Sequence, residues 1–372
     1  MKKSLRLIVA IAIIMTMQVN AFALDKTDQG SIGIDGIDYE TVIEKSENLL
    51  QAAIQSGSYA HLLNKSSFNV GEEIPLYEDS DFTLCTRQLK YYPVFSENEI
   101  VGMIIARVAT TKEVILEFND AFCDELNKYY HNNEPICMIT NNKTLWIVDG
   151  NTYQEIYSEE NNISKLSISE QGALSNMGTL QKKIIKENTD VTVNPTYDTQ
   201  GTVVTGTKSL SVPIKLQSTG SSYCWACVAS SVGQYKKPSV VITPEKLAIE
   251  YAGDLNTSKS FSTIKKILSE KYNVSTSQKN VHLKMSDLQK NINAGNPVAA
   301  HISYSLTTGH FVVVRGYKVT EANKTTMQYS YIMDSLAGNR TLAVSANAID
   351  REIKYYSVSS GTEYNMNSYL EL

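Results

Sequence analysis

Cysteine is scarce in this sequence of 372 residues. It occurs at five positions, Cys85, Cys123, Cys137, Cys224 and Cys227. Small secreted domains that depend on disulfides carry a much denser cysteine pattern, so the sequence excludes a disulfide-stapled scaffold. The odd count leaves at least one thiol free or intermolecular in an oxidising compartment. A disulfide among the first three cysteines stays open, because the sequence does not say which of them would pair.

A positive net charge and long apolar segments are also lacking. The formal net charge is −5, and no basic cluster offsets it, which argues against nucleic acid as a partner. The apolar run at residues 7–17, broken only by Thr16, is too short to span a membrane comfortably. Residues 365–372 are neither long nor apolar enough to be an anchor. We therefore expect no stable membrane anchor.

The amino-terminal residues have the pattern of an export signal. Lys2, Lys3 and Arg6 precede the apolar run, and Ala21-Phe22-Ala23 forms a small-x-small cleavage site. This pattern predicts that residues 1–23 are a signal peptide of a secreted bacterial protein, with a retained signal anchor as the alternative. Removal of the signal would bring the net charge to about −8.

Hydrophobic periodicity predicts an α+β domain at residues 24–158, followed by a linker. A helix is expected within 36–59 and another at 119–130, where Asn119 or Asp120 would be the cap. Strands are expected at 91–95, 100–108, 113–118, 136–139, 145–148 and 152–157. Residues 159–207 are rich in Ser, Asn, Thr, Gln and Gly, apart from a short helix-like patch at 180–185. They predict an exposed linker, the kind of segment where proteolytic nicking concentrates.

Residues 208–372 predict a second α+β domain in which helices precede strands. Helices are expected at 224–236, from Thr243 to Gly253, at 262–272 and from Ser286 to Gly295. Strands are expected at 297–303, 310–320, 327–334 and 340–344. A helical lobe and an antiparallel sheet lobe would place a cysteine and a histidine on opposite sides of a cleft.

Cys224 opens the first of these helices. The unpaired N–H groups and the dipole of a helix amino terminus favour a thiolate, so Cys224 is a candidate nucleophile. A buried structural cysteine is the alternative. Cys227 lies one turn deeper, and we expect it to be a packing thiol. A redox role for Cys-x-x-Cys stays open, although no strand-helix-strand pattern precedes the motif. A zinc site would need a second ligand pair, which does not follow.

His310 is the candidate base, because a glycine precedes it and an apolar strand follows it. His301, in the middle of the preceding predicted strand, is the competing candidate. Asp334 ends the next apolar strand and would accept the second imidazole N–H, unless it only initiates a turn. Gln217 lies seven residues before Cys224 and could donate to an oxyanion.

These residues carry a resemblance to a known superfamily. The segments Gln217, Cys224-Trp225-Ala226, 309–317 and 331–335 are similar to the papain-like cysteine peptidases, in the compact bacterial branch related to double-glycine leader peptidases (peptidase C39-like). The resemblance covers about residues 210–344. It implies that Cys224 is the nucleophile, that His310 is the base and that Asp334 orients the base.

The resemblance also implies that Gln217 completes the oxyanion hole. The spacing from this glutamine to the cysteine is one residue longer than in papain. Residues 92–95 and 100–104 loosely resemble prosegments of secreted bacterial cysteine peptidases.

Taken together, the sequence predicts a secreted bacterial cysteine endopeptidase that is made as a zymogen and cleaved between about residues 190 and 210. We expect a monomer that acts on a polypeptide substrate without a metal or organic cofactor. A transglutaminase-like enzyme or a cell-wall amidase would use the same Cys-His-Asp residues. A catalytically silent surface protein and a thiol oxidoreductase also stay open.

Overall fold

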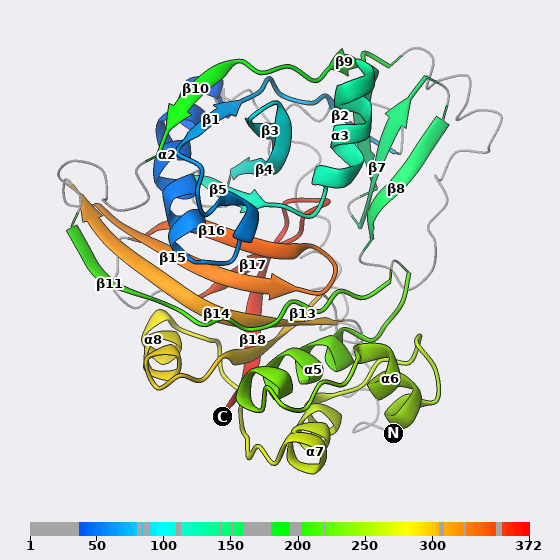
Figure 1. The fold of residues 1–372 in the computed structure, drawn as a ribbon, viewed down its shortest axis with the longest axis vertical. Coiled ribbons are helices and arrows are strands. Elements are labelled where there is room, and N and C mark those ends of the chain that lie inside the picture. Colours follow the sequence, from blue (N-terminus) through cyan, green and yellow to red (C-terminus); the bar gives the residue numbers. More distant parts are fainter. Residues whose placement is uncertain are drawn as a thin grey trace, which may run out of the picture. The chain divides into compact units, whose positions relative to one another are not determined.

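The structure is a computed structural model that describes residues 37–372 apart from several gaps. The gaps are 80–83, 85–88, 109–112, 142, 151, 159–179, 194–202, 219, 305–308, 323–324 and 347–351. Ile37–Leu372 forms one compact unit (Figure 1). The predicted signal peptide, residues 1–23, lies outside the described residues.

The amino-terminal half contains both helices and strands. Its described helices are α2 (Tyr39–Gln55), the 3-10 helix η1 (Ala60–Leu62) and α3 (Cys123–Asn132). Its described strands are β1 (Ser67–Val70), β2 (Leu76–Glu78), β3 (Leu89–Ser96), β4 (Glu99–Val108), β5 (Val114–Asn119), β6 (Pro135–Thr140), β7 (Thr144–Asp149), β8 (Thr152–Ser158), β9 (Lys183–Ile184) and β10 (Thr189–Thr192).

The carboxy-terminal half begins with a strand and continues with helices and then a sheet. The described helices are α5 (Cys224–Lys236), α6 (Pro244–Ala252), α7 (Phe261–Tyr272) and α8 (Met285–Asn293). The described strands are β11 (Val203–Ser209), β12 (Ser277–Lys279), β13 (Val298–Ser303), β14 (Gly309–Ala322), β15 (Thr325–Asp334), β16 (Gly338–Ala346), β17 (Lys354–Tyr356) and β18 (Glu363–Glu371).

One sheet runs through both halves of the unit. Within the described residues it has thirteen strands, in the order β10-β1-β3-β4-β5-β16-β15-β14-β13-β18-β12, with β11 on β14 and β17 on β18. The two halves meet where β5 pairs antiparallel with β16, with Asn119 opposite Arg340 and Leu116 opposite Ala343. The remaining strands form a smaller sheet in the order β2-β6-β7-β8, in which β9 pairs with β6.

Separate apolar cores lie on the two faces of the large sheet. Helix α5 packs against β14 and against α7, and Trp225, Ile264 and Val313 are fully buried in this core. Helix α2 packs on the opposite side, in a core that includes Tyr329 and Tyr331 of β15. Figure 1 shows α5, α6 and α7 grouped on one side of β14 and β15, and α2 on the other. The sheet is therefore a shared layer between the amino-terminal region and the helices that carry Cys224.

Several local sequence signals act as predicted. Thr243 caps α6, Pro244 occupies its first turn, and Gly253 ends it at φ 86°. The turn between β3 and β4 places Glu97 and Asn98 at positive φ, which suits a tight hairpin.

Other helix boundaries differ from the predictions. Helix α3 begins only at Cys123, because the Asn119 side chain accepts from the Ala121 N–H and Asp120 accepts from the Asn339 N–H. Helix α8 is preceded by Lys284 rather than by Ser286. The helix-like patch at 180–185 contains strand β9 instead.

The α+β composition is confirmed, whereas the separation of two domains is not. The pairing of β5 with β16 and the shared core around α2 join the amino-terminal half to the carboxy-terminal half within one compact unit. Strands β9, β10 and part of β11 fall inside the predicted linker 159–207, because they find partners in β6, β1 and β14. The two-lobe papain-like arrangement stays a prediction.

Candidate active site

Cys224 is the first residue of α5, as the sequence predicts. Its side chain is nearly buried, with 8% of its surface exposed. The indole N–H of Trp225 donates to the Thr257 carbonyl at 3.0 Å, which fixes the start of the helix against the following loop. The preceding Tyr223 makes no side-chain capping bond to α5. The first N–H groups of the helix therefore keep their capacity to stabilise negative charge near Cys224.

His310 stands at the start of β14, and Asp334 stands at the end of the neighbouring β15. The two strands are antiparallel, with Asp334 opposite Val312, so the start of one strand meets the end of the other. His310 Nε2 lies 2.8 Å from Asp334 Oδ1, and both side chains are buried. Cys224 lies close enough to His310 for its thiol to act on the pKa of the imidazole. The structure thus brings Cys224, His310 and Asp334 into one contiguous group.

Asp334 is surrounded by donors. Oδ1 accepts from His310 and from the Leu336 N–H, while Oδ2 accepts from Arg340 Nη1 at 3.1 Å and from the Tyr355 hydroxyl at 2.9 Å. Burial raises the pKa of Asp334, but the charges of His310 and Arg340 and these hydrogen bonds outweigh it and lower the pKa below its usual range. Asp334 is therefore held as a carboxylate.

The pKa of His310, in contrast, is raised. Burial lowers its pKa, but the charge and hydrogen bond of Asp334, together with Cys224, outweigh burial and raise the pKa to about 10. The imidazolium is therefore the favoured form at neutral pH. Because Nε2 is engaged by Asp334, Nδ1 is the ring nitrogen that can exchange a proton with the thiol.

Gln217 lies beside this group. Its side-chain Oε1 accepts from the Ser335 hydroxyl at 2.9 Å, and its backbone N–H donates to the Ser335 carbonyl. Its Nε2 donates to the Ser221 carbonyl at 2.9 Å. These bonds fix Gln217 between the residue after Asp334 and the turn before Cys224.

The competing cysteine and histidine have different surroundings. Cys227 is fully buried and close to Ser335, and burial raises the pKa of its thiol well above the usual range. This agrees with the predicted packing role. His301 packs against the rings of Phe261 and Phe311 and pairs across the sheet with Phe311, so it is not part of the group around Asp334.

The cysteines of the described residues are not joined in disulfides. Cys123, Cys137, Cys224 and Cys227 carry free thiols. Cys85 lies outside the described residues. A disulfide between Cys123 and Cys137, one of the pairings that the sequence left open, is therefore absent from this part of the chain.

Sequence reasoning missed three residues of the site, Arg340, Tyr355 and Glu117. Arg340 and Tyr355 donate to Asp334 directly. Glu117 of β5 holds Arg340 with two bonds, from Nε to Oε1 at 2.6 Å and from Nη2 to Oε2 at 2.8 Å. The sequence did hold one signal for this contact, because Glu117 lies inside the apolar strand expected at 113–118. A charged residue in a buried strand needs a partner of opposite charge.

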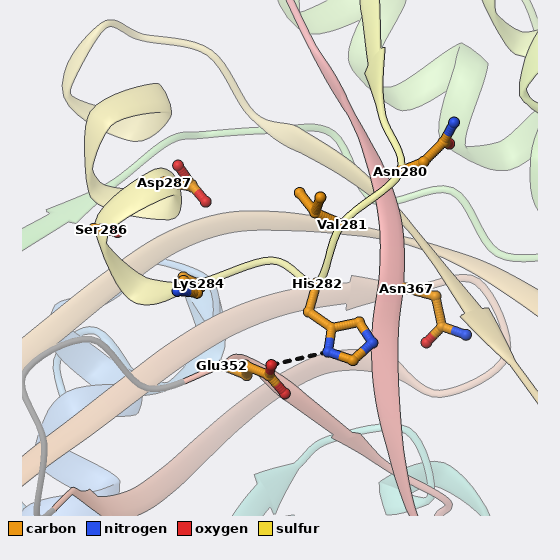
Figure 2. Close-up of a pocket in the computed structure, with 8 residues that line it drawn as sticks. All are labelled: Asn280, Val281, His282, Lys284, Ser286, Asp287, Glu352 and Asn367. Carbon is orange, nitrogen blue, oxygen red and sulfur yellow. Dashed lines mark hydrogen bonds and ion pairs between the residues drawn. The ribbon is translucent and has the colours of Figure 1, made fainter.

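A surface hollow of about 680 Å³, shown in Figure 2, is lined by none of Cys224, His310 and Asp334. It is lined by Asn280, Val281, His282, Lys284, Ser286, Asp287, Glu352 and Asn367. Figure 2 shows that His282 and Glu352 pair with each other, and His282 Nδ1 lies 2.9 Å from Glu352 Oε1. Among the described residues there is no cluster of metal-ligating side chains, and none of the helices they form is long and apolar enough to cross a membrane.

The comparison with protein families bears on the segment that holds Cys224, His310 and Asp334. Residues 209–362 match the model of the Peptidase_C39 like family. No curated protein matches the chain at a significant level. The matched segment contains helices α5 to α8 and strands β12 to β17, and it ends just before β18. Through this segment, the chain is similar to the Peptidase_C39 like family, which supports a relationship to C39-like cysteine peptidases.

Proposed function

We propose that the protein is a cysteine endopeptidase in which Cys224, His310 and Asp334 form the catalytic triad. The observation that supports this most directly is the position of His310, which hydrogen-bonds the Asp334 carboxylate and lies close enough to Cys224 for the thiol to act on its pKa. A nucleophile, a base and a group that orients the base are the elements of acyl transfer by a thiol. Cysteine peptidase activity is also what the family suggests.

The proposed reaction begins with proton transfer from Cys224 to His310. The sulfur then attacks the peptide carbonyl carbon, and the carbonyl electron pair moves onto oxygen. The Cys224 N–H and the second N–H of the Gln217 amide would donate to this oxyanion. When the C–N bond breaks, His310 returns the proton to the leaving amine and a thioester remains. Water, deprotonated by His310, hydrolyses the thioester and regenerates the thiol.

We further propose that the protein is exported and made as a zymogen. The support for export is the pattern of residues 1–23. The support for cleavage is the polar composition of residues 159–207, which lie between strand β8 and the helices that begin at Cys224.

The test is to incubate the purified chain from Leu24 to Leu372 with reductant and follow its intact mass, peptide hydrolysis and labelling by a thiol-directed epoxide. The parent should label at Cys224, hydrolyse peptide bonds and cleave itself within 159–207. Cys224→Ala should do none of these.

Cys227→Ala is the matched control. It should keep all three activities and lose about 1 kcal/mol of unfolding free energy, because it removes only a small buried group. Hydrolysis by the Cys224→Ala variant would refute the proposed nucleophile. Labelling without peptide hydrolysis would favour an amidase or transferase on the same triad.

A further inference from the structure

A row of buried charges connects the amino-terminal region to the proposed triad. Arg107 of β4 lies 3.0 Å from Glu117 of β5, and Glu117 forms two bonds with Arg340 of β16. Arg340 then donates to Asp334, and Asp334 accepts from His310. The signs of the charges alternate along the whole row, so each charge is balanced by its neighbours.

These charges are shielded from water. The side chains of Glu117, Asp334 and Arg340 are 0% exposed, and that of Arg107 is 1% exposed. Buried charges are stable only when they are paired and hydrogen-bonded, and removing one partner leaves the other uncompensated. The charges of the row therefore depend on one another, and a change at Glu117 alters the electrostatic balance at Asp334.

The geometry of Arg340 shows how a change at Glu117 would alter the bonds of Asp334. Glu117 takes up Nε and Nη2, and the Tyr356 carbonyl also accepts from Nη2. This arrangement leaves Nη1 to donate to Asp334 Oδ2. The guanidinium also lies over the Tyr355 ring, 4.4 Å from the ring centroid. Glu117 thus fixes which nitrogen of Arg340 faces Asp334, while Oδ1 of Asp334 stays with His310.

We propose that Glu117 is a positioning residue for the triad, so that the amino-terminal region completes the active site instead of only covering it. The proposal deepens the proposed function, since it assumes that Cys224 and His310 act as the nucleophile and base. Glu117 touches no substrate and acts through Arg340 and Asp334.

Loss of the Glu117 charge has two effects at His310. Arg340 would keep a positive charge balanced only by Asp334, which makes the nearby imidazolium less favourable. The guanidinium would also be free to turn a second nitrogen toward Asp334 and compete with His310. Both effects lower the pH at which the imidazolium loses its proton.

The other titratable groups near His310 do not offset these effects. Tyr304 and Tyr355 face its ring, and neither brings a charge at neutral pH. His301 on the neighbouring β13 has a pKa lowered by burial and by the charge of His310, so it stays neutral. The balance at His310 is therefore set by Cys224 and by the charge row.

The experiment measures the rate at which iodoacetamide alkylates Cys224 in the full chain as a function of pH, with peptide mapping to separate the cysteines. In Glu117→Gln, the alkaline transition of the alkylation profile, where His310 loses its proton, should move down by about one pH unit, which corresponds to a tenfold change in the proton equilibrium. Peptide hydrolysis should lose kcat with little change in KM, and the alkaline limb of its pH profile should move down. Glu117→Asp, which keeps the charge, should reverse part of both the shift and the loss of kcat.

Two further variants separate positioning from folding. Arg107→Met combined with Glu117→Met removes one positive and one negative buried charge together, so it should fold where the single variant is unstable. Its alkylation profile should shift in the same direction as that of Glu117→Gln. Val42→Ala lies in the core around α2 and does not touch the charge row. It should lower the free energy of unfolding and leave the pH profile of alkylation unchanged.

The outcomes distinguish this inference from the proposed function. A folded Glu117→Gln variant with the alkylation profile of the parent would overturn the inference, even if the parent hydrolyses peptides. Failure of both Glu117 variants to fold would limit Glu117 to stability and would overturn it as well. If the parent hydrolyses no peptide but alkylation still depends on Glu117, the peptidase proposal fails and the positioning role stands.

Discussion

Asp334 determines the behaviour of the proposed site at the scale of single residues. It binds His310 through Oδ1, while Arg340 and Tyr355 bind Oδ2. The two oxygens therefore have different duties, because one orients the base and the other anchors the carboxylate in the fold. A change at Asp334 should affect chemistry, and a change at Tyr355 should affect mainly the anchoring.

We predict that Asp334→Asn lowers kcat by about a hundredfold or more, because the amide cannot stabilise the imidazolium and can leave His310 in the wrong tautomer. Tyr355→Phe removes one neutral donor to a buried carboxylate. It should cost about 1 to 3 kcal/mol of unfolding free energy and less than tenfold in kcat. Urea denaturation and steady-state kinetics of both variants check this. Equal losses of kcat in the two variants would contradict the division of roles.

At this scale the sequence indicated the reactive side chains but not the groups that hold them. Cys224, His310 and Asp334 were found because each sits at the end of an expected helix or strand. Arg340 and Glu117 are separated by 223 residues and meet only through strand pairing. No local pattern reports a contact of that kind, so their roles required the structure.

At the scale of elements, the position of α5 depends on its close approach to α7. A Cβ atom added to Gly233 would lie 2.4 Å from ring atoms of Tyr272, which is closer than packed atoms come. Gly233 therefore lets the two helices pack tightly in the core below Cys224.

We predict that Gly233→Ala lowers the free energy of unfolding by about 1 to 3 kcal/mol through overpacking and slows epoxide labelling of Cys224 by displacing α5. Ser231→Ala is the control on the same helix. Its hydroxyl is buried without a hydrogen-bond partner among the described residues, so its loss should be neutral or slightly stabilising. Thermal unfolding and labelling rates check both variants. A stable, normally labelling Gly233→Ala variant would show that the helices can separate without cost.

Most elements were predictable because their signals are local. The helix from Thr243 to Gly253 and the apolar strands from 297 to 344 appear near the expected positions. Strands β17 and β18 were missed. Strand β18 gains its stability from pairing with β13 and β12 rather than from a regular alternation of its own residues.

At the scale of the whole molecule, the shared sheet bears on what cleavage would do. The four residue pairs between β5 and β16, the Glu117–Arg340 bonds and the core around α2 all join segments on either side of residues 159–207. A cut in that segment breaks the covalent connection but none of these contacts.

We predict that a chain cut within 159–207 keeps both fragments together. They should co-elute in gel filtration under native conditions and separate in guanidinium chloride, because a cut removes only chain connectivity. Intact mass before and after denaturation identifies the fragments. Release of the amino-terminal fragment under native conditions would contradict this and would support a removable prosegment.

Stability should also depend on pH in a direction set by the buried charges. The pKa of His310 is raised from 6.5 to about 10 on folding, so its contribution is fully present below pH 6.5 and is lost as pH rises through about 10. The pKa values of Asp334 and Glu117 are lowered, so their contributions disappear as pH falls below about 4.

Urea denaturation of the parent should therefore show a fall in unfolding free energy from pH 7 to pH 10. His310→Gln should flatten this alkaline decline, whereas His282→Gln, which changes an exposed histidine, should not. The prediction fails if the decline is the same in all three proteins.

The pairing of β5 with β16 also determines when, during synthesis of the chain, the proposed site can form. Glu117 and Arg340 are 223 residues apart, and at typical synthesis rates this distance corresponds to an interval of roughly ten seconds or more. During that interval β5 has an open edge and Glu117 has no Arg340. An immature chain that still lacks β16 would therefore lack the Arg340 bond that anchors Asp334, so the proposed triad would gain its support only when synthesis is nearly complete.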